Sequence, residues 1–321
     1  MKRRILSVVV AVFSLACNDG MSGNPMMPSQ VDPSQVAVET TQKIDLSMWS
    51  PYILVHTPGE ALRAYQKAIP ELMARGALKG VRIGIDKNEG RNFVNTWIAS
   101  VVPDTLWILD NHYLFDQNIE QVIDQVMVWY PGIKYLQIGN ETTTILPRNE
   151  PQIPIELYMS VLKRIYTYVQ TRYRGVILVA QSTFGSGKYG SLELERMVEL
   201  GLREMSPNKL IIAMNVYSIS AAHNYSHVVN RLGLRKNDQG YRIWVTESGV
   251  ADPSLHISFV QEVYPFLKNN LKAERVYWYC LYCGEPEQDR GDDHSKYGLI
   301  RGINNPLLLW TSPLYNALTG R

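Results

Sequence analysis

The sequence has few cysteines, no long apolar run and almost no excess of charge. Its 321 residues include only three cysteines, which excludes a small fold held together by disulfides. No run of 18 apolar residues occurs, so no ordinary membrane-spanning helix is expected. The 32 Lys and Arg against 30 Asp and Glu leave a net charge of +2 with no basic stripe, which argues against a nucleic-acid binder. What remains is a globular composition, 45% hydrophobic and 19% charged, in a chain long enough for one α/β barrel or two ordinary domains.

The first 16 residues have the pattern of a secretory signal peptide. Three basic residues precede an apolar run over residues 5–16, and Cys17 follows directly. This arrangement resembles a bacterial lipobox, in which the cysteine is lipidated and becomes the new N-terminus, although Ser14 stands where a Leu is commonest. Simple secretion after ordinary signal-peptidase cleavage and an uncleaved anchor are the alternatives. We therefore expect an exported protein, either a membrane-anchored lipoprotein, periplasmic or at the cell surface, or a secreted one.

The next segment, residues 17–42, is expected to be a flexible tether. Residues 18–40 are rich in Asn, Gly, Ser, Pro, Met and Gln and have no apolar periodicity. No linker or break in composition follows. We therefore expect residues 43–321 to form one domain.

Strand and helix patterns alternate through residues 43–321. Short apolar runs typical of strands lie in 43–56, where 43–49 and 52–56 are both candidates, and at 80–86, 105–110, 135–139, 176–182, 210–217, 242–247 and 275–280. Amphipathic helix patterns occupy 58–77, with Pro70 as a point of kinking or splitting, and 118–129, 155–173, 253–271 and 307–318. Eight such units predict an α/β fold, a single (β/α)8 barrel. A doubly wound sheet is the weaker alternative, because the glycine-rich stretch 185–190 has the wrong spacing for a nucleotide loop.

Two carboxylates end two of these strands, the fourth and the seventh. In such a barrel the C-terminal strand ends meet at one mouth, so Glu141 and Glu247 are expected to face each other. Facing carboxylates in different environments are what glycosidic cleavage requires. Arg82 on the second strand would hold Glu247 ionised and Tyr217 on the sixth would donate to it, while the neighbour of Glu141 is the neutral amide of Asn140.

The same motifs resemble those of clan A retaining glycoside hydrolases. Gly-Asn-Glu at 139–141 is similar to the acid/base motif of the fourth strand, and Trp-Val-Thr-Glu-Ser-Gly at 244–249 to the nucleophile motif of the seventh. The resemblance spans about residues 43–321 and implies that Glu141 is the acid/base and Glu247 the nucleophile. No single family's pattern is matched throughout, so no family within the clan and no substrate carry over.

The resemblance also implies residues that support the reaction or bind substrate. In it, Trp278 on the eighth strand would form the floor of the cleavage subsite, and His112 would lie near the sugar. Trp49 and Gln181 are weaker candidates for sugar contacts. The full set of expected substrate-binding residues is Arg82, His112, Asn140, Tyr217 and Trp278.

The remaining histidines and cysteines do not indicate a cofactor. His223 and His227 are four residues apart, but no Glu lies between them in the zinc-protease arrangement and no third ligand is apparent, so no metal is expected. The Cys-x-x-Cys pair, Cys280 and Cys283, would form a disulfide only if the chain turns after Cys280. The proposed chemistry requires no cofactor.

We therefore expect a retaining glycoside hydrolase that cleaves O-glycosidic, β-type linkages in a poly- or oligosaccharide by double displacement. One alternative is a non-catalytic glycan-binding surface lipoprotein on the same barrel, and another is a transglycosylase that uses the same two Glu residues. The expected partner is carbohydrate and not nucleic acid, with a membrane contacted only through a lipid on Cys17. The glycan, the endo or exo mode and the oligomeric state do not follow from the sequence.

Overall fold

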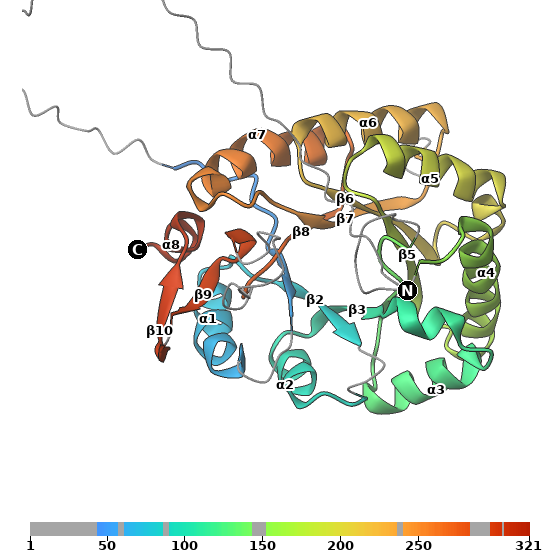
Figure 1. Ribbon diagram of the computed structural model, residues 1–321, viewed down its shortest axis with the longest axis horizontal. Coiled ribbons are helices and arrows are strands. Elements are labelled where there is room, and N and C mark those ends of the chain that lie inside the picture. The colour runs from blue at the N-terminus through green and yellow to red at the C-terminus, as the bar shows by residue number, and fades with distance from the viewer. Residues whose placement is uncertain are drawn as a thin grey trace, which may run out of the picture. The chain divides into compact units, whose positions relative to one another are not determined.

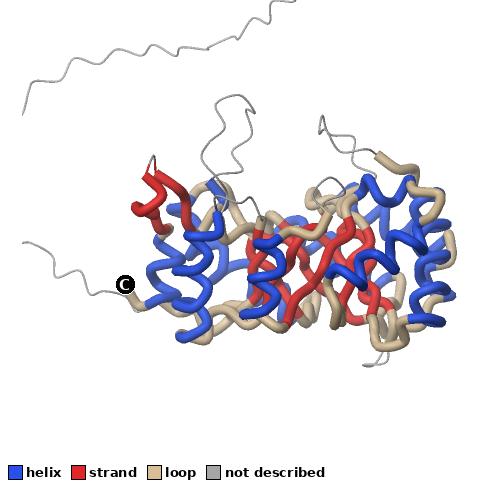
Figure 2. Tube along the Cα trace, turned by 90° about the horizontal axis from the view of Figure 1, so that it is seen from below, coloured by secondary structure: helices blue, strands red, loops and turns tan. Residues whose placement is uncertain are grey.

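Eight parallel strands close into a barrel, and helices surround it (Figure 1). Neighbouring strands pair in sequence order, and the first strand closes the ring by pairing with the eighth. The side view in Figure 2 shows the strands at the centre with helices on both sides. The barrel strands are β1 Tyr52–Val55, β2 Gly80–Ile85, β3 Asp104–Leu109, β4 Tyr135–Ile138, β5 Ile177–Thr183, β6 Leu210–Val216, β7 Arg242–Ser248 and β8 Arg275–Trp278.

The computed structural model describes residues 44–56, 61–85, 90–142, 152–235, 240–282, 296–303 and 305–321, without side chains for 302–309. Residues Ile44–Arg321 form one unit. The expected signal peptide, the tether, Cys17 and Cys283 lie outside the described residues, as does Lys43, where the barrel was expected to begin. None of the described helices is both long and apolar enough to cross a membrane.

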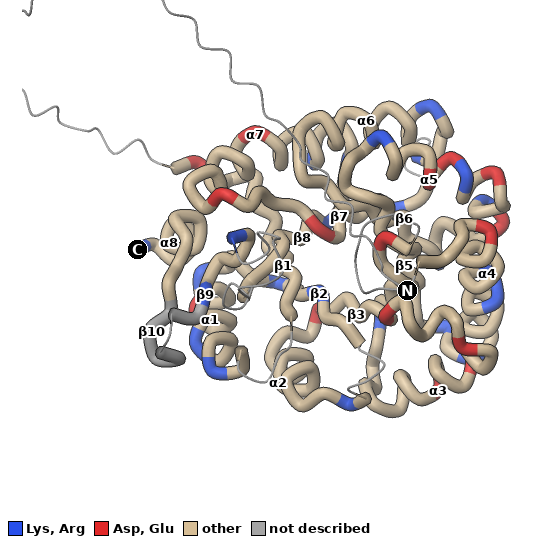
Figure 3. The backbone as a smooth tube through the Cα atoms, in the orientation of Figure 1, with Lys and Arg blue, Asp and Glu red and all other residues tan. Residues whose placement is uncertain are grey.

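The helices that follow the strands cover the outside of the barrel. Their inward faces pack on the strands as one continuous apolar core, which is why the strands carry near-continuous apolar runs. The helices are α1 Leu62–Ala74, α2 Phe93–Val101, α3 Ile119–Trp129, α4 Ile155–Arg172, α5 Lys188–Glu199, α6 Ile219–Arg231, α7 His256–Asn269 and α8 Pro313–Thr319, with short 3-10 turns η2 Asn111–Phe115, η3 Leu202–Glu204 and η4 Pro253–Leu255. Acidic and basic positions are interspersed along the outer helices (Figure 3).

The (β/α)8 fold predicted from the sequence is confirmed, and most strand boundaries agree within one or two residues. The ambiguity in the first strand is resolved in favour of Tyr52–Val55. Helix α1 runs through Pro70 without splitting. Three helices that the sequence patterns did not single out complete the alternation. Side-chain caps begin two of them: Asn92 Oδ1 accepts the Val94 N–H at 2.7 Å at α2, and Ser218 Oγ accepts the Ala221 N–H at 3.1 Å at α6.

The sequence predicted a closing helix over residues 307–318, and the first part of that prediction is wrong. An antiparallel hairpin, β9 Ile300–Ile303 with β10 Asn305–Thr311, occupies the first part of that range. Helix α8 begins only at Pro313, after Ser312, whose Oγ accepts the Tyr315 N–H at 3.1 Å. Proline at the first helical position with serine before it is a strong start signal, and the apolar run before it is equally suited to a strand.

The barrel interior is arranged in layers along its axis. At the N-terminal strand ends, the Arg275 guanidinium lies 4.1 Å from the centre of the Trp244 ring and 4.7 Å from those of Tyr52 and Tyr135, and it pairs with Asp104 at 2.8 Å. Aromatic and apolar side chains thus fill the barrel interior at the N-terminal ends of the strands. Polar side chains follow nearer the C-terminal strand ends, which is where the expected site residues lie.

Candidate active site

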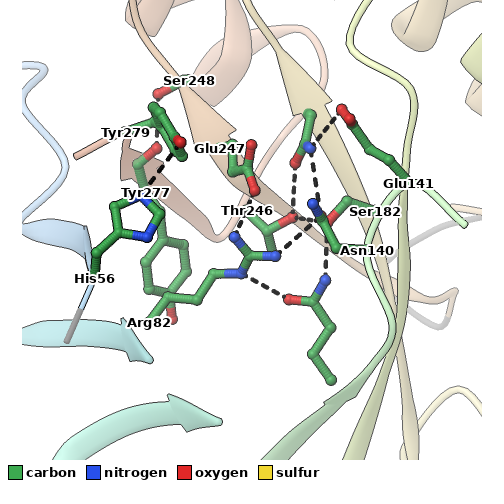
Figure 4. A network of polar contacts seen from close by, with 12 residues as sticks. His56, Arg82, Asn140, Glu141, Ser182, Thr246, Glu247, Ser248, Tyr277 and Tyr279 are labelled. Carbon is green, nitrogen blue, oxygen red and sulfur yellow. Dashed lines mark hydrogen bonds and ion pairs between the residues drawn. The ribbon is translucent and has the colours of Figure 1, made fainter. Parts of the chain in front are cut away.

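Glu247 lies near the end of β7 and is held from two sides. Arg82 Nη1 of β2 donates to Glu247 Oε1 at 2.7 Å, and the Tyr217 hydroxyl, just after β6, donates to Oε2 (Figure 4 shows the Arg82 contact). Burial and the nearby Glu247 and Glu141 carboxylates raise the pKa of Tyr217 well above its usual value, so this hydroxyl keeps its proton and remains a donor. The carboxylate is 6% exposed, so it is stabilised by fixed partners rather than by bulk water.

Arg82 crosses the barrel interior and joins three strands. Besides Glu247, its Nε donates to Gln137 Oε1 at 2.9 Å and its Nη2 donates to Asn140 Oδ1 at 3.0 Å. Gln137 is itself fixed, because its Nε2 donates to Ser182 Oγ at 2.9 Å and to the Gly139 carbonyl at 3.0 Å. A guanidinium that is 2% exposed requires such partners, so the fork of Arg82 fixes Glu247 in one place.

Glu141 follows β4 in an unusual backbone conformation. Its φ is +45°, and its N–H donates to the Ser182 carbonyl at 3.0 Å. Gly139, two residues earlier, has φ of +76°, and a Cβ there would lie 2.8 Å from Thr142 Cγ2, so glycine is required at the start of this turn. Positive φ at a non-glycine residue is a strain that the surrounding contacts hold in place, and at Glu141 the side chain it carries contacts Asn215.

Glu141 is 7% exposed, and its side chain contacts a residue of β6, two strands further round the barrel. Asn215 Nδ2, near the end of β6, donates to Glu141 Oε1 at 2.8 Å and lies 3.5 Å from Asn140 Oδ1. A continuous set of contacts therefore runs from Glu141 through Asn215, Asn140 and Arg82 to Glu247 (Figure 4). Two carboxylates on different strands are thereby brought to the same end of the barrel, one paired with a cation and one with an amide.

Asn140 is placed by Asn111, which follows β3. The Asn140 N–H donates to Asn111 Oδ1 at 2.8 Å, and Asn111 Nδ2 returns a bond to the Asn140 carbonyl at 2.8 Å. This two-way contact holds the β4 turn against the neighbouring strand end. Asn111 was not among the expected site residues, although it stands directly beside His112 in the sequence.

His112 lies in η2, at the same end of the barrel. Its Nδ1 is 2.6 Å from Asp110 Oδ1, which also accepts the His112 N–H at 2.7 Å. The Asp110 carboxylate thus fixes the imidazole, whose side chain is 41% exposed. His112 is therefore partly exposed, and its described contacts are with Asp110 rather than with either Glu.

Trp278 is not placed to contact sugar, which corrects the expectation from sequence. It is 0% exposed, its Nε1 donates to the Tyr297 carbonyl at 3.1 Å, and its ring packs against His256 at 4.8 Å and Phe259 at 5.9 Å between centroids. The weaker candidate Trp49 is buried beside it at 6.3 Å. Both rings belong to the layer between the barrel and its helices. Gln181 is also buried, where its Oε1 accepts the Thr142 N–H at 2.9 Å.

The aromatic side chains near Glu247 are tyrosines. The Tyr297 ring lies 5.7 Å from those of both Tyr217 and Tyr279, and His56 Nε2 is 3.2 Å from the Tyr279 hydroxyl. Sequence reasoning missed Tyr279 and chose its neighbour. The alternation of side chains along an extended chain was the available signal. Trp278 ends β8 and Tyr279 follows it, and only one of two such neighbours could face the mouth.

Other sequence candidates fall outside this site. His223 packs its ring on Phe266 at 4.2 Å. No three His, Cys, Asp or Glu side chains gather as a metal site would need within the described part of the chain. Cys280 is disulfide-bonded, and its expected partner Cys283 lies outside the described residues.

Comparisons with known proteins identify the fold. No protein-family model matches the chain, and no curated protein sequence does either. Solved structures do match: the endo-β1,6-glucanase BT3312 has a TM-score of 0.59 at 9% identity, covering 84% of this chain and 74% of that one. A family 51 α-L-arabinofuranosidase from Bifidobacterium longum has a TM-score of 0.53 at 10% identity, covering 87% and 73%. An endo-laminarinase from Formosa Hel1_33_131 has a TM-score of 0.51 at 12% identity, covering 78% and 83%.

The chain therefore shares its barrel fold with these solved structures, and its motifs resemble those of clan A glycoside hydrolases. No family within the clan is assigned. The two carboxylates lie after β4 and near the end of β7, where that resemblance placed them.

Proposed function

We propose that the protein is a retaining glycoside hydrolase that cleaves β-linked poly- or oligosaccharides, with Glu247 as nucleophile and Glu141 as acid/base. The observation that carries the proposal is the unequal setting of the two carboxylates. Glu247 is paired with the buried Arg82 and with Tyr217, and Glu141 accepts a hydrogen bond from the neutral amide of Asn215. A carboxylate fixed by a buried guanidinium and a second carboxylate in a different polar setting suit the division of labour that double displacement needs.

In the first step, a carboxylate oxygen of Glu247 attacks the anomeric carbon while Glu141 gives its proton to the departing glycosidic oxygen. Arg82 and Tyr217 each occupy one lone pair of Glu247, and each oxygen keeps a second lone pair for attack. The fixed Arg82 fork orients the nucleophile before substrate arrives, so little reorganisation is needed in the transition state. The products of this step are the released alcohol and a glycosyl ester on Glu247.

In the second step, Glu141 removes a proton from water and the resulting hydroxide displaces Glu247 from the anomeric carbon. Configuration is inverted twice and so retained. Asn140, which Asn111 and Arg82 hold in place, would donate its amide N–H to the sugar 2-hydroxyl, a contact that strengthens in the transition state. Tyr279, Tyr297 and His112 are the side chains we expect to contact the sugar, and the chemistry requires no cofactor.

Three of the structural neighbours are named as glycosidases of different specificity, which supports a carbohydrate substrate but not a particular one. A panel of β-glucans, β-galactans, β-mannans and β-xylans is therefore the direct test. Incubation with purified protein should release sugars from at least one of them. Proton NMR of the first product should show the β-anomer before mutarotation. An initial α-anomer would contradict retention.

The matched variants for this test are Glu247→Gln and Glu262→Gln. Glu247→Gln should remove activity, whereas Glu262, exposed on α7, should be replaceable without effect. Binding without cleavage by wild type on every glycan would favour the glycan-binding lipoprotein instead. Products longer than the substrate would show a transglycosylase, which uses the same two Glu residues but excludes water. A crystal structure should place the two carboxyl groups about 5–5.5 Å apart, and a separation of about 6.5–9.5 Å would mean inversion.

We also propose that the enzyme acts after export. The basic and apolar segment before Cys17 supports export through a signal peptide, with the tether separating barrel and membrane if Cys17 is lipidated. An exported glycosidase would meet polymeric glycans that do not enter cells, which agrees with a poly- or oligosaccharide substrate.

A further inference from the structure

Two buried hydroxyl groups, those of Ser182 on β5 and Thr246 on β7, lie in the polar network of the site and have no part in the mechanism above. Both residues are 0% exposed, and their side-chain oxygens are 2.5 Å apart. Figure 4 shows them in the same network as Glu141 and Glu247. Buried hydroxyls need hydrogen-bond partners, so the direction of each bond follows from the donors and acceptors around them.

The direction of these bonds is set at Arg82, because a guanidinium can only donate. Arg82 Nε donates to Gln137 Oε1 at 2.9 Å, so the amide nitrogen of Gln137 must point the other way. That nitrogen, Nε2, donates to Ser182 Oγ at 2.9 Å. Ser182 Oγ therefore accepts a hydrogen bond from Gln137 and has its own proton left to donate.

The acceptor for the Ser182 proton is Thr246 Oγ1, and Thr246 in turn donates to Asn215 Oδ1 at 3.3 Å. The opposite direction, with Thr246 donating to Ser182, satisfies fewer groups. Neither the Ser182 proton nor the Asn215 carbonyl oxygen would then have a partner among the described contacts. Buried polar groups without partners are unfavourable, so the bonds run from Ser182 through Thr246 to Asn215.

The last bond of this series reaches the candidate acid/base. Because Thr246 donates to the carbonyl oxygen of Asn215, the Asn215 amide nitrogen faces Glu141 and donates to its Oε1 at 2.8 Å. A flipped Asn215 amide would instead turn its oxygen toward Glu141 Oε1 and toward Asn140 Oδ1, which lies 3.5 Å from Asn215 Nδ2. In the acid form of Glu141, the oxygen that accepts this N–H is the carbonyl oxygen, so the proton is carried by Oε2.

We propose that Ser182 and Thr246 are positioning residues for Glu141. Through Asn215, they pass on the donor direction that Arg82 sets, and so fix which oxygen of the acid/base holds its proton. The inference rests on the proposed function of Glu141. The same guanidinium pairs directly with the candidate nucleophile, so one buried cation organises both carboxylates. Hydrogen bonds that all run in one direction polarise one another, which favours a single arrangement of the series.

The variant Thr246→Val tests this, because it removes the hydroxyl and keeps the shape of the side chain. Without a donor to its oxygen, the Asn215 amide is no longer held in the orientation that donates to Glu141. On whichever β-glycan of the panel is cleaved, kcat/KM should fall at least about tenfold, a part of the ~10²–10⁴-fold that acid/base assistance supplies. On a nitrophenyl β-glycoside kcat/KM should change little, because its leaving group needs little protonation. Thr246→Ser keeps the hydroxyl and should behave like wild type on both substrates.

The matched control is Thr105→Val, which removes a buried hydroxyl by the same substitution outside this network. Thr105 lies on β3, is 6% exposed, and its Oγ1 donates to the Val102 carbonyl at 2.8 Å. This variant should lose stability without changing the ratio of the two kcat/KM values. An equal loss on both substrates in Thr246→Val, or no loss on either, overturns the positioning role.

Neutron diffraction from crystals of the wild-type protein in D2O tests the bond directions without substrate. The Ser182 deuterium should point to Thr246 Oγ1, and the Thr246 deuterium should point to Asn215 Oδ1. A Thr246 deuterium directed at Ser182, or at the Met214 carbonyl 3.4 Å away, overturns the inference while leaving glycoside hydrolysis intact. Full activity of Glu141→Ala on all substrates would instead overturn the proposed function, and the neutron map would still decide the bond directions.

Discussion

Arg82 of β2 and Glu247 of β7 form an ion pair at 2.7 Å across the barrel, although 165 residues separate them in the chain. Both side chains are almost fully buried. Pairs of this kind are weak evidence for stability, because desolvation of both ions offsets their attraction. The pair is better explained by the proposed reaction, because it fixes the Glu247 carboxylate in one place.

Replacing Arg82 by Met should cost both stability and activity. The variant leaves the Glu247 carboxylate buried without its cation, and breaking a buried pair in this way typically costs about 3–5 kcal/mol. Urea denaturation at pH 7 measures that loss. Activity should fall by at least ~100-fold because the nucleophile is no longer held in place.

The double variant Arg82→Met with Glu247→Gln is the control. It removes the unpaired charge along with the cation, so it should be more stable than Arg82→Met alone while remaining inactive. Equal stability of the single and double variants would show that an unpaired Glu247 carboxylate does not destabilise the fold.

His256 should make the fold less stable in mild acid. This residue begins α7, is 0% exposed, and packs its ring 4.8 Å from that of Trp278. Burial lowers the pKa of His256 to about 4, against about 6.5 in an unfolded chain. Below pH 6.5 the unfolded state takes up a proton that the folded state does not, so the free energy of unfolding should decrease by up to about 3 kcal/mol as pH falls toward 4.

Urea denaturation of wild type and His256→Phe between pH 4 and 7 measures this contribution. The variant should lose part of the decrease, since no histidine is left to protonate on unfolding. His227→Gln, at an exposed position on α6, should follow wild type. Parallel pH curves for wild type and His256→Phe would contradict the assignment.

The strand positions of the two candidate carboxylates could be predicted from the sequence because the signals for them are strong. Glu141 and Glu247 each follow a buried apolar run at a strand end, where barrel enzymes place functional groups. Arg82 inside an apolar strand required a buried partner, and the structure supplies Glu247. These inferences needed only strand order, which an eightfold alternation determines well.

The rest of the site depended on details that periodicity does not provide. To choose between Trp278 and Tyr279, one must know which of the two side chains faces the barrel mouth. An error of one residue in the register of the strand exchanges the two. Gln137 and Asn215 are polar residues within otherwise apolar strands, and such residues indicate buried polar contacts.

Membrane attachment should depend on the Cys17 thiol. If a lipid is attached there, wild type should fractionate with membranes, and Cys17→Ser should appear in the soluble periplasmic fraction or the medium. Labelling with a radioactive or alkyne-bearing palmitate should mark wild type but not the variant. Equal solubility of the two proteins, without label on either, would indicate simple secretion.

The two carboxylates should respond differently to removal. Glu247→Ala should abolish turnover of natural and activated substrates, because no glycosyl-enzyme can form. Added azide or formate should restore cleavage of a nitrophenyl glycoside by entering the vacated space and attacking the anomeric carbon directly, which gives a product of inverted configuration. Product NMR checks the configuration.

Glu141→Ala should instead retain the first step on a nitrophenyl glycoside, because nitrophenolate leaves with little protonation. Hydrolysis of the glycosyl-enzyme should become slow because no base remains, so a burst of nitrophenolate and a covalent adduct detectable by intact-protein mass spectrometry are expected. On the natural glycan the rate should fall by at least about 10²–10⁴-fold, the usual worth of acid/base assistance. The expectation follows from position: Glu141 contacts the amide of Asn215, whereas Glu247 is paired with Arg82. Azide rescue of Glu141→Ala with retained configuration would agree with this role, and the reverse pattern in the two variants would mean that the roles are exchanged.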